Sequence, residues 1–205
     1  MSNPMPPAQP PVLSPDRLAV HLRDGGAAVI PTDTVVGLAV MPTMANRIWT
    51  LKRRPADKPL ILMGAETDAL LQHVRVECHD DARTLAESHW PGALTLVLPA
   101  DGGLIDSLNP GGTSLGIRIP DCATTVRLLE CTGPLATSSA NPSGEPAAMT
   151  AMEASDYFPE LPCLGPLPWP AASGQASTVI IWQGPGQWHL VRRGAVMPSE
   201  LQAWP

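Results

Sequence analysis

The sequence predicts an α/β fold, with a twisted, open, mixed sheet and helices packed on it. Short apolar runs such as 27–30 and 94–98 have the length of buried strands, and they alternate with amphipathic stretches of helical period. Strands that alternate with helices indicate a sheet covered by helices. The last two apolar runs, 177–182 and 188–194, flank a Gly-Pro-Gly turn and predict an antiparallel hairpin, so the sheet should be mixed.

The composition is that of an ordinary globular chain. With 205 residues, 44% hydrophobic and 16% charged, it is long enough to bury a sizeable core. The net charge of −6 argues against a dedicated nucleic-acid binder, which is usually basic over one face. The four cysteines form no C-x-x-C or zinc pattern, which favours reduced thiols and a cytoplasmic location. No secretory signal precedes Arg17, and no apolar run approaches the roughly 18 residues of a membrane span.

The chain divides into a tail and one domain. Residues 1–13 contain five prolines and no periodic apolar face, which predicts a Pro-rich flexible tail. Residues 14–205 are expected to form a single domain. Its first helix should begin with Ser14 as N-cap and Pro15 at the first helical position, and should end at Gly25.

The next elements follow in order. The apolar run 27–30 ends at a proline and predicts a buried strand, and a second run covers 35–40. Thr43 is predicted to cap a helix whose apolar residues recur at i, i+4 and i+7. This helix should end at Arg54, because the proline that follows disfavours the helical region for that residue. A further strand is expected at 60–64.

The remaining elements are predicted from the same cap, strand and turn signals. Helices are expected around 67–73 and 80–88, capped by Thr67 and Asp80, followed by a strand at 94–98, a loop at 99–113 and a strand at 114–120. A helix capped by Asp121 comes next, then a strand that begins at Leu135 and turns into a polar loop by Gly144, and an irregular, proline-rich segment at 159–170.

The positive charge of the chain is concentrated in one short segment. The only two lysines, Lys52 and Lys58, lie there together with Arg47, Arg53 and Arg54, which places five of the thirteen Lys and Arg residues within positions 47–58. Such a cluster suits a polyanionic ligand such as a triphosphate. The alternative interpretation is a solvated helix end, where cations are favoured by the helix dipole.

A second polar group stands between two strand-like runs. Thr32, Asp33 and Thr34 place two hydroxyls and a carboxylate where a sheet could present them to a ligand. The alternative is a simple turn, since Thr and Asp commonly form local bonds with the backbone.

The sequence contains no phosphate loop of the form G-x-x-x-x-G-K-[ST], no dinucleotide fingerprint, no G-x-S-x-G elbow and no His pattern for a general base. What remains is a set of hydroxyls, an amide and cations near predicted strand ends, with no obvious nucleophile. Its members are Thr32, Thr34, Lys52, Arg54, Lys58, Ser114, Arg118, Ser139, Asn141, Ser177 and Arg192. Such a site works by positioning and charge stabilisation, which is what phosphoryl or nucleotidyl transfer requires.

Seven segments, in order, resemble motifs of the YrdC-like domain family, and the resemblance covers about residues 14–200. They are Pro31–Leu38 (P-T-D-T-V-V-G-L), Lys52–Pro55 with Lys58–Leu60, Trp90–Thr95, Arg118–Pro120, Ser139–Gly144, Ser177–Val179 and Arg192–Gly194.

The resemblance implies threonylcarbamoyl-AMP synthase activity. Members of the family combine L-threonine, bicarbonate or CO2, and ATP into L-threonylcarbamoyladenylate and pyrophosphate. The product serves N6-threonylcarbamoyladenosine formation at position 37 of tRNA, through a downstream threonylcarbamoyl-transferase complex. The family fold has a concave basic groove, and Mg²⁺ accompanies ATP.

The resemblance also implies roles for individual residues. The cations that hold the ATP phosphates would be Lys52 and Arg54, at catalytic positions, and Lys58. The nucleotide would also be lined by Ser114, Asn141 and Arg192. The residues gripping threonine or its carbamate would be Thr34, Arg118, Ser139 and Ser177, with Arg118 paired to a carboxylate. No residue is expected to ligate a metal directly.

Two departures keep alternatives open. Val36 stands where the family motif usually has Tyr, and the extra C-terminal domain of longer members is not expected after Gly194. The chain could therefore be a paralogue that binds nucleotides or double-stranded RNA, including tRNA, without this activity. A third interpretation is a carbamoyl-adenylating relative used in metal-centre maturation, although its zinc-type motifs are absent from the sequence.

Overall fold

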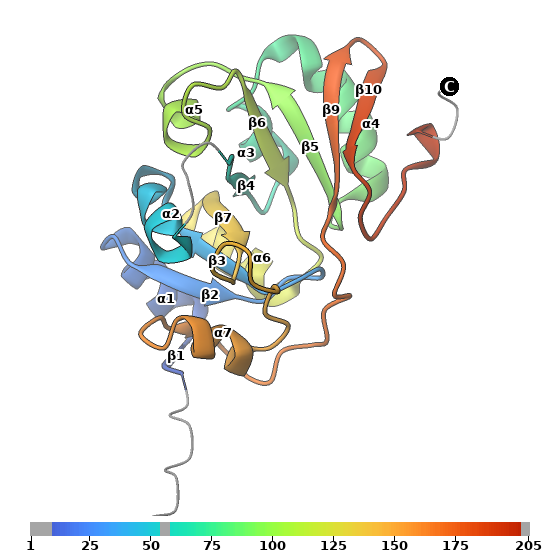
Figure 1. Cartoon of the computed structure of the whole chain (residues 1–205). Helices are drawn as coiled ribbons and strands as arrows, with labels where there is room; N and C mark the ends of the chain where they lie inside the picture. The colour runs from blue at the N-terminus through green and yellow to red at the C-terminus, as the bar shows by residue number, and fades with distance from the viewer. Residues whose placement is uncertain (1–9, 54–57, 202–205) are drawn as a thin grey trace, which may run out of the picture.

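The computed structural model describes residues 10–53 and 58–201, which form one ten-stranded sheet with helices on both faces (Figure 1). The strands are β1 (Val12–Leu13), β2 (Ala27–Ile30), β3 (Gly37–Val40), β4 (Ile61–Met63), β5 (Leu94–Pro99), β6 (Ser114–Arg118), β7 (Leu135–Ser139), β8 (Cys163–Leu164), β9 (Thr178–Gly184) and β10 (Gln187–Arg192). The helices are α1 (Pro15–Arg23), α2 (Asn46–Lys52), α3 (Thr67–Leu71), α4 (His79–His89), α5 (Gly103–Leu108), α6 (Ala123–Thr132) and α7 (Ala151–Tyr157), with short 3₁₀ turns η1 (Pro42–Met44), η2 (Val76–Cys78) and η3 (Ser199–Leu201).

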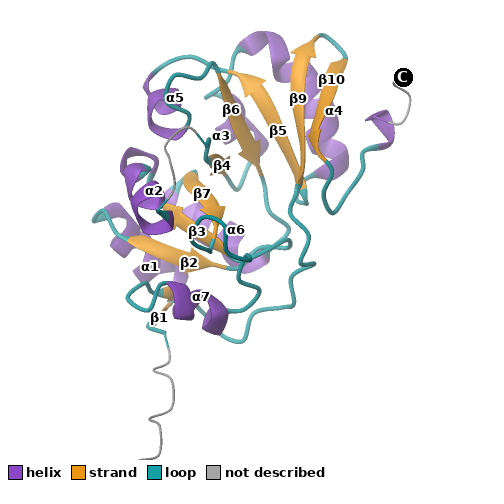
Figure 2. Cartoon of the chain, viewed as in Figure 1, coloured by secondary structure: helices purple, strands orange, loops and turns teal. Residues whose placement is uncertain are grey.

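The sheet is mixed, as the sequence predicts. Its strand order is β1-β8-β2-β3-β7-β4-β6-β5-β9-β10, with parallel pairs such as β4–β6 and β5–β9 and antiparallel pairs such as β2–β3 and β9–β10. The predicted C-terminal hairpin is therefore confirmed, and it forms one edge of the sheet (Figure 2).

Alternation of side chains along the strands divides the core into two layers. In β2 and β3, Ala28, Ile30 and Ala39 face one cluster, while Val29 and Leu38 face the other, as expected for a pleated strand of period two. The first cluster is covered by α1 and α6, which pack against each other. The larger second cluster continues beneath α2, α3, α4 and α7. Both faces of the central strands are thus buried, which leaves their ends as the places where polar side chains can meet.

Several predicted helix starts are wrong. Ser14 and Pro15 do occupy the N-cap and first position of α1. In contrast, Thr43 lies within η1 and Ala45 is the N-cap of α2, because a proline at position 42 begins a separate 3₁₀ turn. The N-caps of α3, α4 and α6 are Glu66, Cys78 and Cys122 rather than the predicted Thr67, Asp80 and Asp121.

Four helices and strands, α5, β1, β8 and α7, lie where the sequence predicted none. The loop at 99–113 contains α5, and the expected tail includes β1, which pairs in parallel with β8 inside the proline-rich segment 159–170. The N-cap of α7 is Thr150, whose Oγ1 accepts from the Glu153 amide, and the Glu153 carboxylate accepts from the amide of Met149, one residue before the N-cap. Residues 1–9 of the expected tail lie outside the described residues.

The longest helix among the described residues is α4, with 11 residues, and no helix there is long and apolar enough to cross a bilayer.

Candidate functional site

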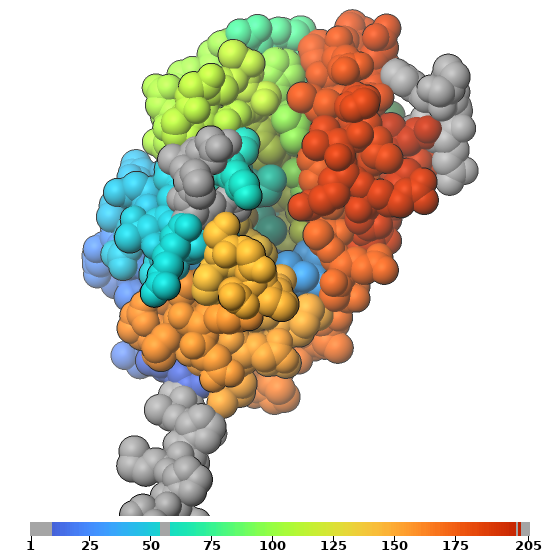
Figure 3. Space-filling model, in the orientation of Figure 1, coloured from blue at the N-terminus to red at the C-terminus, as the bar shows by residue number. Residues whose placement is uncertain are grey.

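A cavity of about 370 Å³ lies where strands from both halves of the chain end. Figure 3 shows a hollow on this face, between the orange-red C-terminal segment and the yellow segment that follows β7. The cavity is lined by Thr32, Thr34, Val35, Val36, Gly37, Pro59, Ile61, Met63, Arg118, Thr137, Ser138, Ser139, Ala147, Gly174, Ala176, Ser177, Val179 and Arg192.

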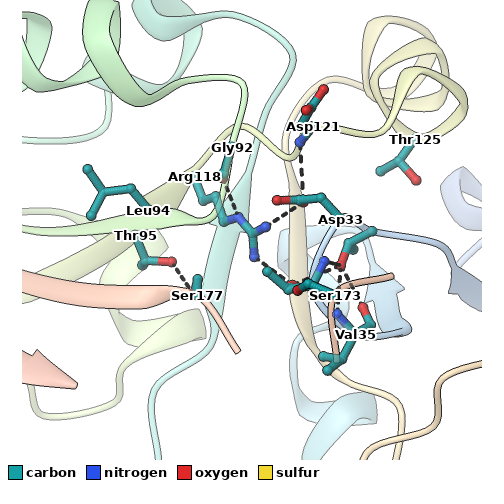
Figure 4. A network of polar contacts seen from close by, with 12 residues as sticks. Asp33, Val35, Gly92, Leu94, Thr95, Arg118, Asp121, Thr125, Ser173 and Ser177 are labelled. Carbon is teal, nitrogen blue, oxygen red and sulfur yellow. Dashed lines mark hydrogen bonds and ion pairs between the residues drawn. The ribbon is translucent and has the colours of Figure 1, made fainter. Parts of the chain in front are cut away.

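Arg118, the last residue of β6, lies at the centre of a polar network (Figure 4). Its side chain is buried, and its Nε donates to the carbonyl oxygen of Gly92 at 2.9 Å. Nη1 donates to Thr34 Oγ1 at 3.0 Å, and Nη2 forms an ion pair with Asp33 Oδ1 at 2.5 Å. The same carboxylate oxygen accepts from the amide of Asp121 at 3.2 Å. One buried guanidinium therefore joins the end of β6 to two other segments, the turn at Asp33 and Thr34 and the loop at Gly92.

Burial lowers the pKa of Arg118, because a charged group loses hydration there, whereas Asp33 opposes this shift by attraction. The charge of Arg192 lowers the pKa of Arg118 further. A guanidinium remains protonated at neutral pH even so. Asp33 compensates one of these two like charges, so the two arginines leave a net positive charge beside the cavity, which attracts an anion.

The turn before β3 presents two buried threonines. Thr32 Oγ1 donates to the carbonyl oxygen of Val35 at 2.6 Å and accepts from the amides of Thr34 and Val35 at 3.1 and 3.2 Å. It also lies 3.0 Å from Thr34 Oγ1. The alternative of a simple turn is partly right, since these bonds are local. The two threonine side chains nevertheless line the cavity as well.

The opposite wall is built around Ser177. Arg192 Nη2 donates to the Ser177 carbonyl oxygen at 2.9 Å and to its hydroxyl at 3.3 Å, and that hydroxyl lies 2.9 Å from Thr95 Oγ1 (Figure 4). Partial burial beside these groups lowers the pKa of Arg192. The bonds fix the guanidinium of an edge strand against the segment that enters β9.

Lys52, the last residue of α2, is only 2% exposed. Its Nζ donates to the carbonyl oxygen of Asn141 at 2.7 Å, to its amide oxygen at 3.2 Å, and to both oxygens of Ser139. The backbone is joined as well, since the amide of Ser143 donates to the carbonyl of Lys52 at 2.8 Å. Lys52 and the turn after β7 therefore form one unit at the edge of the cavity.

The structure brings together most of the predicted site residues. Thr34, Arg118, Ser139, Ser177 and Arg192 line the cavity. Lys52 and Asn141 reach it through their bonds with Ser139 and its turn.

Two predicted residues, Ser114 and Lys58, do not line the cavity, and a third, Arg54, cannot be placed. Ser114 stands at the opposite end of β6 from Arg118 and does not line the cavity. Lys58 is exposed, although the adjacent Pro59 lines the cavity. Arg54 lies outside the described residues, so its predicted role remains a prediction.

Three polar residues of the site were not predicted. Thr137 and Ser138 line the cavity, and Thr95 is buried behind Ser177. Thr137 and Ser138 belong to the same polar run as Ser139, and Thr95 is the polar residue within an apolar strand; both signals were present in the sequence. Val36, where the family motif usually has Tyr, is buried and also lines the cavity.

The donor set does not suggest a metal held by the protein. Of the described residues that line the cavity, none carries a carboxylate. Across residues 10–53 and 58–201, no three His, Cys, Asp or Glu side chains gather as metal ligands would.

Curated relatives are identical to this chain at about a third of the aligned positions. It is 34% identical over 151 residues to the threonylcarbamoyl-AMP synthase of Pyrococcus abyssi, covering 71% of this chain and 44% of that protein. The protein of the same name from Neisseria gonorrhoeae is 31% identical over 147 residues, covering 69% of this chain and 77% of that protein. This chain thus spans less than half of the archaeal relative and most of the bacterial one.

Solved structures share the fold. The P. abyssi Sua5 structure complexed with L-threonine has a TM-score of 0.80 and 31% identity, covering 88% of this chain and 54% of that one. Escherichia coli YciO has a TM-score of 0.78 at 21% identity and covers 91% of both chains, which supports the fold alone. The family described as "Telomere recombination" matches residues 20–194 and includes the YrdC-like proteins predicted from the seven motifs. The chain therefore belongs to the Sua5/YciO/YrdC family.

Proposed function

We propose that the chain is an L-threonylcarbamoyladenylate synthase that forms threonylcarbamoyl-AMP and pyrophosphate from L-threonine, bicarbonate and ATP. The observation that carries this proposal is the pair of guanidiniums, Arg118 and Arg192, beside a cavity lined by hydroxyl groups. None of the described residues that line the cavity has a carboxylate side chain. Its volume of about 370 Å³ falls within the usual range of about 300–1,000 Å³ for small-molecule sites. The names of the relatives, and the L-threonine complex of P. abyssi Sua5, support the same conclusion.

The chemistry needs orientation more than a nucleophile from the protein. The amine of threonine attacks the carbon of bicarbonate or CO2 to give a carbamate, and water is lost when bicarbonate is the donor. A carbamate oxygen then attacks the α-phosphorus of ATP, and the bond to pyrophosphate breaks. The protein lowers the barrier by aligning the two substrates and by neutralising charge that develops on phosphate oxygens.

The geometry suggests how the residues divide this work. Arg118, Thr34, Ser139 and Ser177 are assigned to the amino acid or its carbamate, around the buried centre of the cavity. The nucleotide is assigned to Arg192 and to the unit of Lys52 and Asn141. Lys58, Ser114 and Arg54 are assigned to it on the family motifs alone. Mg²⁺ is treated as part of the substrate, bound to the triphosphate, because the described lining offers it no carboxylate.

The product is an activated acyl adenylate, and a transferase must consume it. We assign that step to a tRNA threonylcarbamoyl-transferase complex in the cytoplasm, where ATP and tRNA are present. Binding of double-stranded RNA is not proposed as the main activity, because the net charge of −6 opposes the phosphate contacts on which such binding depends.

The test is pyrophosphate release by the purified protein with MgATP. We expect release that requires both L-threonine and bicarbonate, together with an adenylate product detected by mass spectrometry. Release that is independent of threonine, or an absence of adenylate at substrate concentrations in the millimolar range, would contradict the proposal.

A further inference from the structure

The chain has only two lysine side chains, and the structure gives them different surroundings. Lys52 is 2% exposed, and its Nζ donates to oxygens of Ser139 and Asn141. Lys58 is exposed, and no described residue forms an ion pair or a hydrogen bond with its ammonium. Only one lysine amine is therefore accessible to a reagent that forms in the cavity and then leaves it.

The backbone holds Lys58 beside the cavity. The indole Nε1 of Trp49 donates to the carbonyl oxygen of Lys58 at 3.2 Å. The next residue, Pro59, lines the cavity, and the amide of the buried Leu60 donates to the carbonyl oxygen of Leu108 at 2.8 Å. The chain thus runs from an exposed lysine, past the cavity wall, into the core, which places Lys58 at the mouth of the cavity.

The product of the proposed reaction is a reagent that acylates amines. Threonylcarbamoyl-AMP is a mixed anhydride, in which the carbamoyl carbon is bonded to an oxygen of the AMP phosphate. An uncharged amine can attack this carbon as a nucleophile. A bond between nitrogen and carbon then forms, the bond from carbon to the phosphate oxygen breaks, and a proton of the amine passes to water. The products are AMP and a urea that joins the lysine nitrogen to the nitrogen of threonine.

Other side chains are less suited to this reaction. The guanidiniums of the arginines stay protonated. Cys78 and Cys163 are buried, and burial raises the pKa of each thiol to about 11, which keeps it protonated at neutral pH. Acylation of Lys52 would remove its charge and its bonds to Ser139 and Asn141, and almost none of the side chain is exposed. The exposed lysine is therefore the expected acceptor.

We infer that Lys58 is a self-modification site, where the amine captures the threonylcarbamoyl group of the protein's own product before the adenylate leaves. This inference rests on the proposed function, which supplies the activated carbonyl. The urea replaces the lysine ammonium with a neutral group and adds the carboxylate of threonine. Because the family motifs assign Lys58 to the nucleotide, the modified protein should bind MgATP more weakly. Synthesis then slows when too little product is consumed downstream.

Peptide mass spectrometry after turnover tests the modification. Protein incubated with L-threonine, bicarbonate and MgATP should gain, at Lys58, the mass of threonine plus CO2 less water. Carbon-13 bicarbonate should make this gain heavier, because the carbonyl comes from the proposed reaction. We expect roughly tenfold or more label at Lys58 relative to Lys52, and none without ATP. Label confined to the terminal α-amine, or equal label at both lysines, overturns the site.

The variant Lys58→Arg keeps the positive charge and removes the nucleophilic amine. It is incubated until it has released as much pyrophosphate as the wild-type protein. The peptide that contains position 58 should then carry no label, since a guanidinium does not attack the carbonyl. Label in this peptide of the variant would mean that another group is the acceptor, which overturns the assignment to Lys58.

A mixture of two copies distinguishes capture in the cavity from attack on released adenylate. The second copy is nitrogen-15 Arg192→Met, in which synthesis is expected to be slow while Lys58 is intact. Capture before release should label Lys58 of the active copy roughly tenfold or more above Lys58 of the second copy. Equal labelling of the two copies overturns capture of the bound product.

The effect on the nucleotide is measured by isothermal titration. Anion exchange separates the modified protein, because its net charge is more negative. MgATP binding should be roughly tenfold weaker in the modified protein, as for the loss of one charged hydrogen bond, while L-threonine binding stays within about twofold. Lys58→Glu, which also exchanges a positive charge for a negative one, should reproduce this loss. Equal MgATP affinity of the modified and unmodified forms overturns the inhibitory effect.

Failure of this inference is distinguishable from failure of the proposed function. Wild-type protein that forms the adenylate over many turnovers while Lys58 stays unlabelled overturns only the modification. Wild-type protein that forms no adenylate overturns the proposed function, and the modification with it, because the reagent is then absent.

Discussion

The ammonium of Lys52 lies 2.7 Å from the carbonyl oxygen of Asn141, a residue 89 positions later in the chain. This bond joins the end of α2 to the turn after β7, and both are buried. The relationship gives the basic segment a structural role in shaping the edge of the cavity, beyond the attraction of phosphate by charge.

Lys52→Met is therefore expected to reduce both stability and activity. Leaving buried acceptors on Ser139 and Asn141 without this donor should cost about 1–3 kcal/mol of unfolding free energy. A displaced turn should also lower pyrophosphate release on the order of a hundredfold. Urea unfolding and the pyrophosphate assay measure the two effects. Arg53→Met, at the exposed neighbouring position, is the control and should leave activity near wild type. An unchanged Lys52→Met variant would contradict the role given to this bond.

Arg192 and Arg193 are adjacent but differ in their contacts. Both are exposed, but Arg192 lines the cavity and donates to Ser177, whereas Arg193 is outside the cavity lining. Arg192→Met should lose about 2–4 kcal/mol of transition-state stabilisation, the range observed for one electrostatic donor. Arg193→Met should change kcat/KM by less than threefold. Steady-state kinetics with varied ATP compares the two variants. Equal losses of kcat/KM would show that positive charge in this region matters and that the position of Arg192 does not.

Arg53 has a positive φ of 49°, which ends α2 in the left-handed conformation. Glycine adopts this conformation without the steric penalty of a side chain. Arg53→Gly is therefore expected to raise the unfolding free energy by about 0.5–1 kcal/mol. The midpoint of urea unfolding measures this change. A lower midpoint would mean that the Arg53 side chain stabilises the fold by more than its left-handed backbone conformation destabilises it.

Two buried thiols predict a loss of stability at high pH. Burial raises the pKa of Cys78 and of Cys163 to about 11, from an ordinary value of 9.0. Above pH 9 the unfolded chain releases these protons while the folded chain keeps them. The stabilisation is therefore complete below pH 9 and is lost as the pH rises towards 11. Urea midpoints at pH 8 and 10.5 should show the fall, and a Cys78→Ala/Cys163→Ala double variant should show a smaller one.

Removal of divalent cations should abolish turnover without altering the protein. With EDTA in excess, pyrophosphate release should stop, because the triphosphate loses its counter-ion. Thermal unfolding and threonine affinity should stay the same, since no described residue of the cavity lining is a carboxylate. A lower melting temperature in EDTA would instead indicate a metal bound by the protein itself.

Local signals predicted the parts of the fold that depend on neighbouring residues. The strand at 27–30 and the hairpin at the C-terminus follow from apolar runs and turn residues, and both are confirmed. The predicted N-caps Thr43 and Asp80 are wrong. Both residue types are favourable N-caps, but no local rule tells at which of several neighbouring residues the helix begins. The start of α2 is instead set by a 3₁₀ turn that begins at a proline.

The site was predictable in its residue types more than in its contacts. Arg118 was expected to pair with a carboxylate of the substrate, which stays a prediction; its bond to Asp33, 85 positions earlier in the chain, was not predicted. Ser114 lies at the opposite end of its strand from Arg118, so its expected contact with the nucleotide stays a prediction. Pairings of this kind depend on the order of strands in the sheet, which a periodic pattern does not encode.

The bonds from Ser173 and Gly174 to the backbone carbonyls of Asp33 and Thr34 have a consequence for biosynthesis. The walls of the hollow are made first by the opening turn and last by the hairpin that ends at Arg192, so a ribosome-bound chain lacks a complete ligand site until most of its length has emerged. Ligand capture by this protein thus requires that the opening turn and the C-terminal hairpin have come together.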